Sequence, residues 1–114
     1  MDKKIRLAQP FDFFGNMARE VTLKEPNSGL FFRHGEPRIA VLTGTGSGYF
    51  VEQPHAVAAY LGSLLFIGKD ACPPELLSLE DAATVKEELF GFFTELARKR
   101  DAAKLTTSSL ESNS

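Results

Sequence analysis

The sequence predicts an α+β domain: a small N-terminal antiparallel sheet or set of hairpins over about 19–52, then two main helices over about 55–68 and 79–100. Two patterns carry this prediction, since the first half is rich in short extended runs and turn residues, whereas the second half repeats apolar residues at helical spacing. With 114 residues, 43% of them apolar and 25% charged, the chain has the composition of one globular domain. We expect that domain to span 1–104, followed by a disordered polar tail over 105–114.

The strand prediction follows the chain from Arg19. Residues 19–24 alternate between polar and apolar side chains, and Pro26 ends the run. A second short extended run is predicted over 30–33. The runs 38–42 and 49–52 flank a glycine-rich segment and are expected to form a β-hairpin. Residues 2–18 show no regular pattern because Pro10 and Gly15 interrupt their apolar residues.

The helix prediction rests on caps and on apolar periodicity. Pro54 suits the first turn of a helix, and Gly68 is a natural C-terminal stop. Ser78 is an N-cap candidate for the second helix, with acidic residues in the first turn facing the helix dipole. That helix carries a stripe of apolar residues, which are Ala82, Val85, Leu89, Phe92, Phe93 and Leu96.

Charge and cysteine content restrict the partners and the compartment. The net charge is −2, so no basic excess favours nucleic acid as a partner. No apolar run approaches the length of a membrane span or a signal peptide, and membrane partners are therefore not expected. The single cysteine, Cys72, excludes an internal disulfide and suits a reducing compartment, which makes the cytoplasm the expected location.

The glycine-rich segment 43–48 is the main candidate for a cofactor site. A phosphate-binding loop needs a helix directly after its glycines, but extended residues and Pro54 follow here. Tyr49 stands where a P-loop has its lysine. A mobile hairpin loop is therefore the favoured interpretation and no cofactor is expected, while a small nucleotide-binding domain stays open as an alternative function.

Catalytic and metal-binding sets are poorly supported. His34, His55 and Cys72 lack the close spacing of metal ligands. The paired acids at 80–81 and 87–88 are adjacent on a helix and point in different directions, so they do not form a catalytic dyad. The pattern predicts a protein that is not an enzyme and that binds no metal.

Surplus aromatic residues point to protein contacts. On the predicted helices, Phe66 and Phe90 lie away from the apolar stripes. The pair Phe31 and Phe32 would point to opposite faces of a strand and need cover on both sides. These four residues are the candidates for a protein interface, and a thick core or a misassigned segment is the alternative.

The order of several short motifs resembles that of tail assembly chaperones of long-tailed bacteriophages. The run V-T-L-K-E-P over 21–26 leads into Gly29-Leu30, and later L-S-L-E-D over 77–81 leads to Phe92-Phe93. The resemblance spans about 19–96. The sequence departs from the family pattern where Phe31 and Phe32 follow Gly29-Leu30, a position near which the family often has an acidic residue.

The resemblance implies a function and partners. Such a protein binds the tape measure protein in the host cytoplasm, keeps it soluble until the tail tube forms around it, and is absent from the finished virion. The family implies contact with the tail tube protein through a frameshifted longer form, and self-association into a homo-oligomer. A small structural subunit that stays in the particle, such as a connector or tail terminator, is the alternative function.

Overall fold

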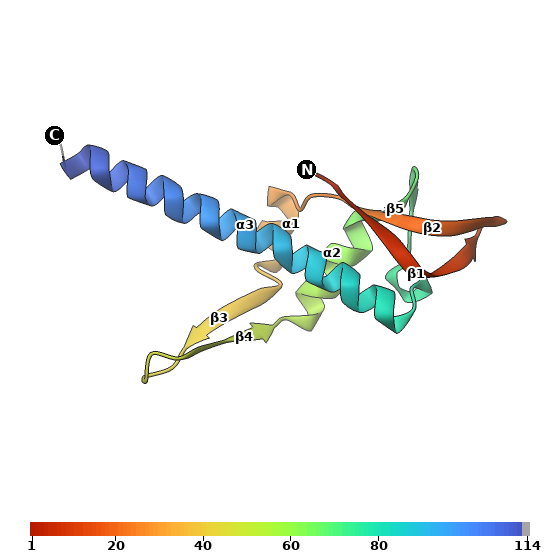
Figure 1. Ribbon diagram of the computed structural model, residues 1–114, viewed down its shortest axis with the longest axis horizontal. Helices are drawn as coiled ribbons and strands as arrows, with labels where there is room; N and C mark the ends of the chain where they lie inside the picture. The colour runs from red at the N-terminus through yellow and green to blue at the C-terminus, as the bar shows by residue number, and fades with distance from the viewer. Residues whose placement is uncertain (113–114) are drawn as a thin grey trace.

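The computed structural model describes residues 1–112, with side chains described for residues 1–103. It confirms the α+β class: antiparallel strands are followed by helices, and the last helix is long (Figure 1). The molecule is elongated, with principal extents of 63 × 33 × 25 Å. The long last helix extends from one end of the molecule and the N-terminal strands lie at the other end, while a two-stranded ribbon projects separately (Figure 1).

Residues 2–18, for which the sequence shows no regular pattern, belong largely to a β-hairpin. Strand β1 (Lys3–Phe13) pairs antiparallel with β2 (Asn16–Leu23), which contains most of the predicted run 19–24. The two-residue turn Phe14-Gly15 has positive φ angles of 50° and 83°, as the tight turns of twisted hairpins require. The register shifts between Arg6 and Phe11, so β1 contains a bulge.

The main sheet has four strands in the order β1-β2-β5-β6. Strand β5 (Leu65–Ile67) adds to β2, and β6 (Asp70–Ala71) forms the far edge. The predicted helix over 55–68 is therefore too long: α2 spans Pro54–Leu64, beginning at Pro54 as expected. Sheet pairing overrides helical periodicity in the apolar run of β5, and Gly68, with φ of 61°, forms the turn to β6 rather than a helix cap.

The extended run predicted over 30–33 is wrong, because these residues lie in helix α1 (Ser28–His34). Asn27 is the N-cap, and its side-chain oxygen accepts a hydrogen bond from the Leu30 N–H at 3.0 Å. Gly35 ends the helix with φ of 72°, and its N–H donates to the Phe31 carbonyl. Asn27 and Gly35 are therefore the two caps of this short helix.

The predicted hairpin over 38–52 is confirmed. Strands β3 (Arg38–Leu42) and β4 (Gly48–Glu52) form a separate two-stranded sheet. The connecting segment closes with hydrogen bonds from Thr43 N–H to the Ser47 carbonyl and from Gly46 N–H to the Thr43 carbonyl. We call residues 38–52 the β3–β4 ribbon.

A single 3-10 turn, η1 (Pro74–Leu76), precedes helix α3 (Leu79–Ser112). The start of α3 matches the prediction, but its backbone continues beyond residue 100. A disordered tail is predicted over 105–114. The side chains of these residues lie outside the described part of the chain, as does the backbone of 113–114, and the disorder therefore stays a prediction.

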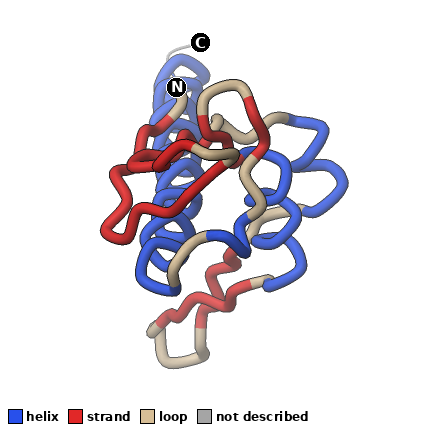
Figure 2. Tube along the Cα trace, turned by 90° about the vertical axis from the view of Figure 1, so that its right-hand side faces the viewer, coloured by secondary structure: helices blue, strands red, loops and turns tan. Residues whose placement is uncertain are grey.

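One core joins the sheet to the helices. Figure 2 shows the hairpin of β1 and β2 lying along α3, with α2 beside them. The inward side chains of β1 and β2 pack with the buried faces of α2 and α3. The most completely buried side chains of the whole core cluster are Val21, Leu23, Tyr60, Leu65, Cys72, Val85 and Leu89.

Candidate protein-interaction surfaces

The four predicted interface residues lie in different environments. Phe90 is only 2% exposed, so its expected availability on the surface is wrong. It is buried because α3 packs against several elements at once, and the Arg38 guanidinium lies 4.6 Å from its ring. Phe66 is half-buried in β5, with the Lys24 ammonium 4.0 Å from its ring.

Phe31 and Phe32 lie on α1 rather than on a strand. Phe32 is 83% exposed, and Phe31 is half-buried at 6.4 Å from the stacked ring of Phe93. Phe31 therefore turns toward α3 while Phe32 faces solvent. Of the four predicted residues, these two lie on one helix, with their ring centroids 6.2 Å apart, and only Phe31 faces α3.

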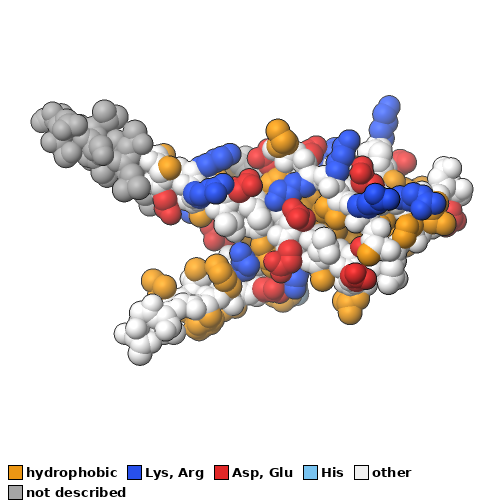
Figure 3. Space-filling view, in the orientation of Figure 1, with side chains coloured by type: hydrophobic (Ala, Val, Ile, Leu, Met, Phe, Trp, Pro, Cys, Tyr) orange, Lys and Arg blue, Asp and Glu red, His pale blue; other side chains and the backbone are white. Residues whose placement is uncertain are grey.

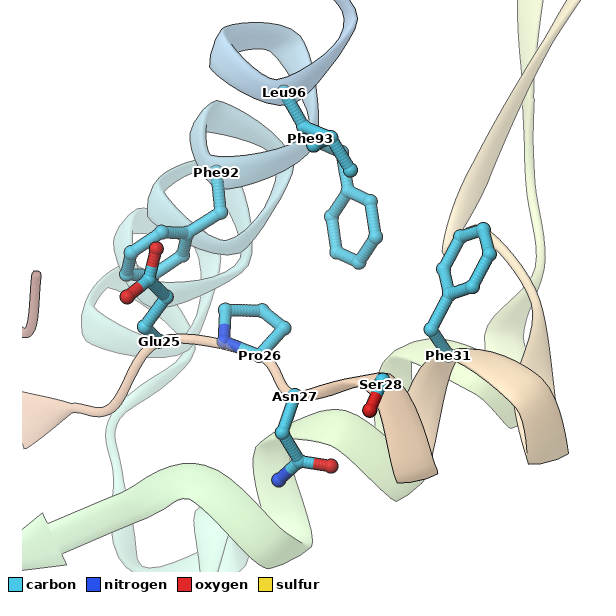
Figure 4. Close-up of a pocket in the computed structure, with 8 residues that line it drawn as sticks. All are labelled: Glu25, Pro26, Asn27, Ser28, Phe31, Phe92, Phe93 and Leu96. Atoms are coloured by element: carbon cyan, nitrogen blue, oxygen red, sulfur yellow. The ribbon is translucent and has the colours of Figure 1, made fainter.

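Phe31 forms one wall of an apolar groove between α1 and α3, which we call the α1–α3 groove. Its volume is about 250 Å³, and Phe93 and Phe31 face each other across it (Figure 4). Glu25, Asn27 and Ser28 contribute polar atoms to its lining. The apolar lining residues are Pro26, Phe31, Phe92, Phe93 and Leu96.

Short-range contacts fix the walls of the groove. The Tyr60 hydroxyl donates a hydrogen bond of 2.7 Å to the Gly35 carbonyl, which ties α2 to the end of α1. The Tyr60 ring also lies 5.4 Å from Phe93 in an edge-to-face arrangement. Burial and the nearby Glu36 carboxylate raise the pKa of Tyr60, so the hydroxyl keeps its proton at neutral pH.

The groove residues of α3 were assigned to the core stripe by their spacing. That stripe continues past the body of the domain, because Leu96 is 41% exposed while Leu89 is fully buried. The next turn of the helix carries exposed Arg98, Lys99 and Arg100. Lys99 follows Leu96 by three residues and so shares its face of α3, whereas Arg100 lines the cavity beside β3 and β4. The groove lining itself contains the carboxylate of Glu25 and no basic residue.

The β3–β4 ribbon is a second exposed apolar surface. Figure 3 shows hydrophobic side chains along this projection. The five side chains concerned are Ile39 at 43%, Leu42 at 81%, Tyr49 at 55%, Phe50 at 60% and Val51 at 39% exposed.

Groups that could perform chemistry are scattered. No cluster of three or more His, Cys, Asp or Glu side chains with metal-binding geometry occurs among the described residues. His34 and His55 are exposed, and they lie on different helices. Cys72 is buried, and burial together with the Glu75 carboxylate raises the pKa of its thiol, which disfavours the reactive thiolate.

The glycine-rich segment does not form a phosphate cradle of the usual kind. Strand β4 begins at Gly48, directly after the loop, and α2 begins only at Pro54. The loop amides of Thr43 and Gly46 are used inside the turn itself. The helix N-terminus that would concentrate amide dipoles on a phosphate is therefore not adjacent to these glycines.

Comparison with known proteins adds no relative: no family model matches the chain, and no curated protein or solved structure shows significant similarity. Within the described residues, none of the helices has the combination of length and hydropathy needed to cross a membrane. Function is therefore inferred from the surfaces themselves and from the motif order.

Proposed function

We propose that this chain is a tail assembly chaperone of a long-tailed bacteriophage, which binds a helical segment of the tape measure protein. The motif order in the sequence first suggests this function. The observation that carries it in three dimensions is the α1–α3 groove, an apolar depression lined by aromatic rings on a small domain. Phe92-Phe93, which is part of the family resemblance, lies in this groove.

The groove suits the apolar face of an amphipathic helix. Such a helix presents large side chains at spacings of three and four residues, and aromatic-lined grooves accept them. Lys99, one helical turn after Leu96, can pair with an acidic residue beside the apolar face of a client helix. Binding of this kind would cover apolar client surface that otherwise drives aggregation.

A shallow groove also suits temporary binding. Its volume of about 250 Å³ holds only a few side chains, so the contact is far smaller than a permanent interface. A client held in this way can be displaced when tube subunits assemble around it. Long clients would bind several chaperone copies, each covering a short segment.

The test is co-expression with the longest helix-rich tail protein encoded in the same genome. We expect the wild-type chain to keep that client soluble and to co-purify with it. Leu96→Lys should weaken binding by roughly 10- to 100-fold, the usual effect of losing one apolar contact of about 1–3 kcal/mol. Leu79→Lys is the matched control, because Leu79 is an 88% exposed leucine on the same helix, outside the groove.

Equal binding by both variants would exclude the groove as the client site. A client that stays insoluble in the presence of wild-type chain would contradict the chaperone function itself. Mass spectrometry of purified virions separates the chaperone from a structural subunit, since only a connector or terminator would persist in the mature particle.

A further inference from the structure

The β3–β4 ribbon is a two-stranded sheet with an exposed edge and an exposed apolar face. It pairs with no other strand of the described chain, and two-stranded ribbons are only marginally stable in water. Side chains alternate between its faces, so Arg38, Ala40 and Phe50 lie on the face that lines a cavity with α3. The opposite face is formed entirely by apolar or aromatic residues, which are Ile39, Val41, Tyr49 and Val51.

The hydrogen-bond pattern shows which backbone groups of β4 are free. Gln53 N–H donates to the Pro37 carbonyl and Thr43 N–H to the Ser47 carbonyl, at the two ends of the ribbon. Because bonded and non-bonded pairs alternate in an antiparallel ladder, the inward-bonded residues of β4 are Tyr49 and Val51. The backbone N–H and C=O groups of Gly48, Phe50 and Glu52 therefore point outward from the free edge.

This free edge lacks the protection found on the edge of the main sheet. Edge strand β1 carries Lys3, Lys4, Arg6, Pro10 and a bulge, all of which discourage pairing with another chain. The ribbon carries no charge and no proline between Arg38 and Glu52. All five residues of β4 are exposed, whereas Arg38 and Val41 of β3 are half-buried, so β4 offers the more accessible edge.

We infer that a second copy of this chain occupies the edge, with β4 pairing antiparallel to β4 across a two-fold axis at Phe50. The two Phe50 residues would exchange both of their backbone hydrogen bonds, forming a continuous four-stranded sheet. Tyr49 would then lie opposite Val51 of the other copy, a favourable aromatic and β-branched pair. Glu52 would lie opposite Gly48, so no like charges face each other.

The charge pattern is the reason to choose a second copy as the occupant. In a two-fold contact the same surface of both copies forms the interface, so a charged residue near the axis lies close to the identical residue of the other copy. The neutral stretch Ile39–Val51 avoids that repulsion. Two-fold pairing also uses up the β4 edge of both copies, and it therefore stops at a dimer. This inference does not depend on the proposed function.

The contact is small, because only five residues of each copy pair, and standard interfaces bury about 800 Å² per partner. We therefore expect a reversible dimer that forms at micromolar or higher concentration. Sedimentation analysis over a concentration series should detect it. Hydrogen exchange at the same concentrations should show the amides of Phe50 and Glu52 becoming protected as the dimer forms.

Charge substitution tests the register. The double variants Tyr49→Lys/Val51→Lys and Tyr49→Glu/Val51→Glu should each be monomeric, because like charges face each other across the axis. Mixing the two should restore a one-to-one dimer. The matched control is Ile39→Lys/Val41→Lys, which places the same charges on the same face but on β3, and it should still dimerise. Thermal melts of each variant check that the domain stays folded.

Three results would overturn the inference. A wild-type chain that stays monomeric up to about millimolar concentration has no such contact. If the β3 control variant is also monomeric, the dimer is held together by packing of the apolar ribbon faces and not by pairing of the β4 edges. A dimer in which the Phe50 amide exchanges as fast as in the monomer excludes β4 pairing, and this readout needs no variant.

Discussion

Removing the Asp81 carboxylate should destabilise the domain more than any other single change to its charged residues. Asp81 is 2% exposed and accepts hydrogen bonds from the backbone N–H groups of Ala8 at 2.8 Å and Gln9 at 3.0 Å. The Ser78 hydroxyl donates a third, at 3.1 Å. These contacts join the bulge of β1 to the first turn of α3, two segments more than seventy residues apart.

The magnitude follows from the groups that lose their acceptor. In Asp81→Ala, two partly buried backbone N–H groups have no partner, and each costs about 1–3 kcal/mol. Because Ala8 and Gln9 are exposed residues, water can partly replace the lost acceptor, and we expect a total loss in the lower part of the summed range, about 2–4 kcal/mol in the free energy of unfolding. For a domain of this size, that loss lowers Tm by roughly 10–20 °C.

The pH dependence gives an independent readout of the same carboxylate. Burial alone would raise its pKa, but the hydrogen bonds from Ala8, Gln9 and Ser78 outweigh that effect and lower the pKa of Asp81 below the usual value. The folded state therefore binds this proton more weakly than the unfolded state. The stabilisation is complete above the ordinary Asp pKa of about 3.9 and is lost as the pH falls toward the lowered pKa.

The assay is urea denaturation followed by circular dichroism, at pH 7 and through the acid range. Glu80→Ala is the matched control: Glu80 is an exposed acid one residue earlier in the same helical turn, and its loss should cost at most about 0.5 kcal/mol. If Asp81→Ala costs less than about 1 kcal/mol at pH 7, or keeps the acid slope of the wild type, the carboxylate does not hold the bulge as described.

Three further changes probe the packing around α1 and α2. Tyr60→Phe removes the hydrogen bond to the Gly35 carbonyl and should cost about 1 kcal/mol in urea denaturation, with little change in the core, since the ring remains. Gly35→Ala should cost about 1–3 kcal/mol, because φ of 72° with ψ of −160° is a backbone conformation that essentially only glycine adopts, while the space around the site is open. Gly62→Ala, inside α2 and also in open space, should instead stabilise the domain. Cys72 should react with a thiol reagent at least about tenfold more slowly in the folded protein than in urea, because its thiol is buried and its pKa is raised by burial and by Glu75.

Local signals predicted the strands and helices whose pattern agrees with their final contacts. The hairpin over 38–52 has two extended runs joined by glycines, and the start of α3 has Ser78 as its cap, with the Asp81 N–H donating to the Ser78 hydroxyl at 3.2 Å. Both features depend on residues close in sequence. That is why they could be inferred from the chain alone.

Contacts between residues far apart in the sequence determine the elements that the hydrophobic pattern did not predict. Residues 65–67 continue the apolar periodicity of α2, and only the edge of β2 converts them to a strand. The hairpin of β1 and β2 was obscured by Pro10, which lies in the irregular part of β1, between Arg6 and Phe11 where the register shifts. The buried role of Asp81 was also invisible, because its partners lie in that distant bulge.

Of the four predicted interface residues, Phe90 is the one that the structure buries, for a reason that can be generalised. Helical geometry placed Phe90 off the main stripe, but α3 packs on several sides, and Arg38 covers the ring. The ribbon that supplies this cover has an apolar outer face of its own, formed by short residues such as Val51 as well as by Tyr49. Aromatic rings can be buried inside their own domain, so paired phenylalanines are weak evidence for a binding surface. Unpaired backbone groups at a sheet edge form hydrogen bonds only with water or with another strand. An uncharged edge strand without a partner is therefore the better indication of a binding surface.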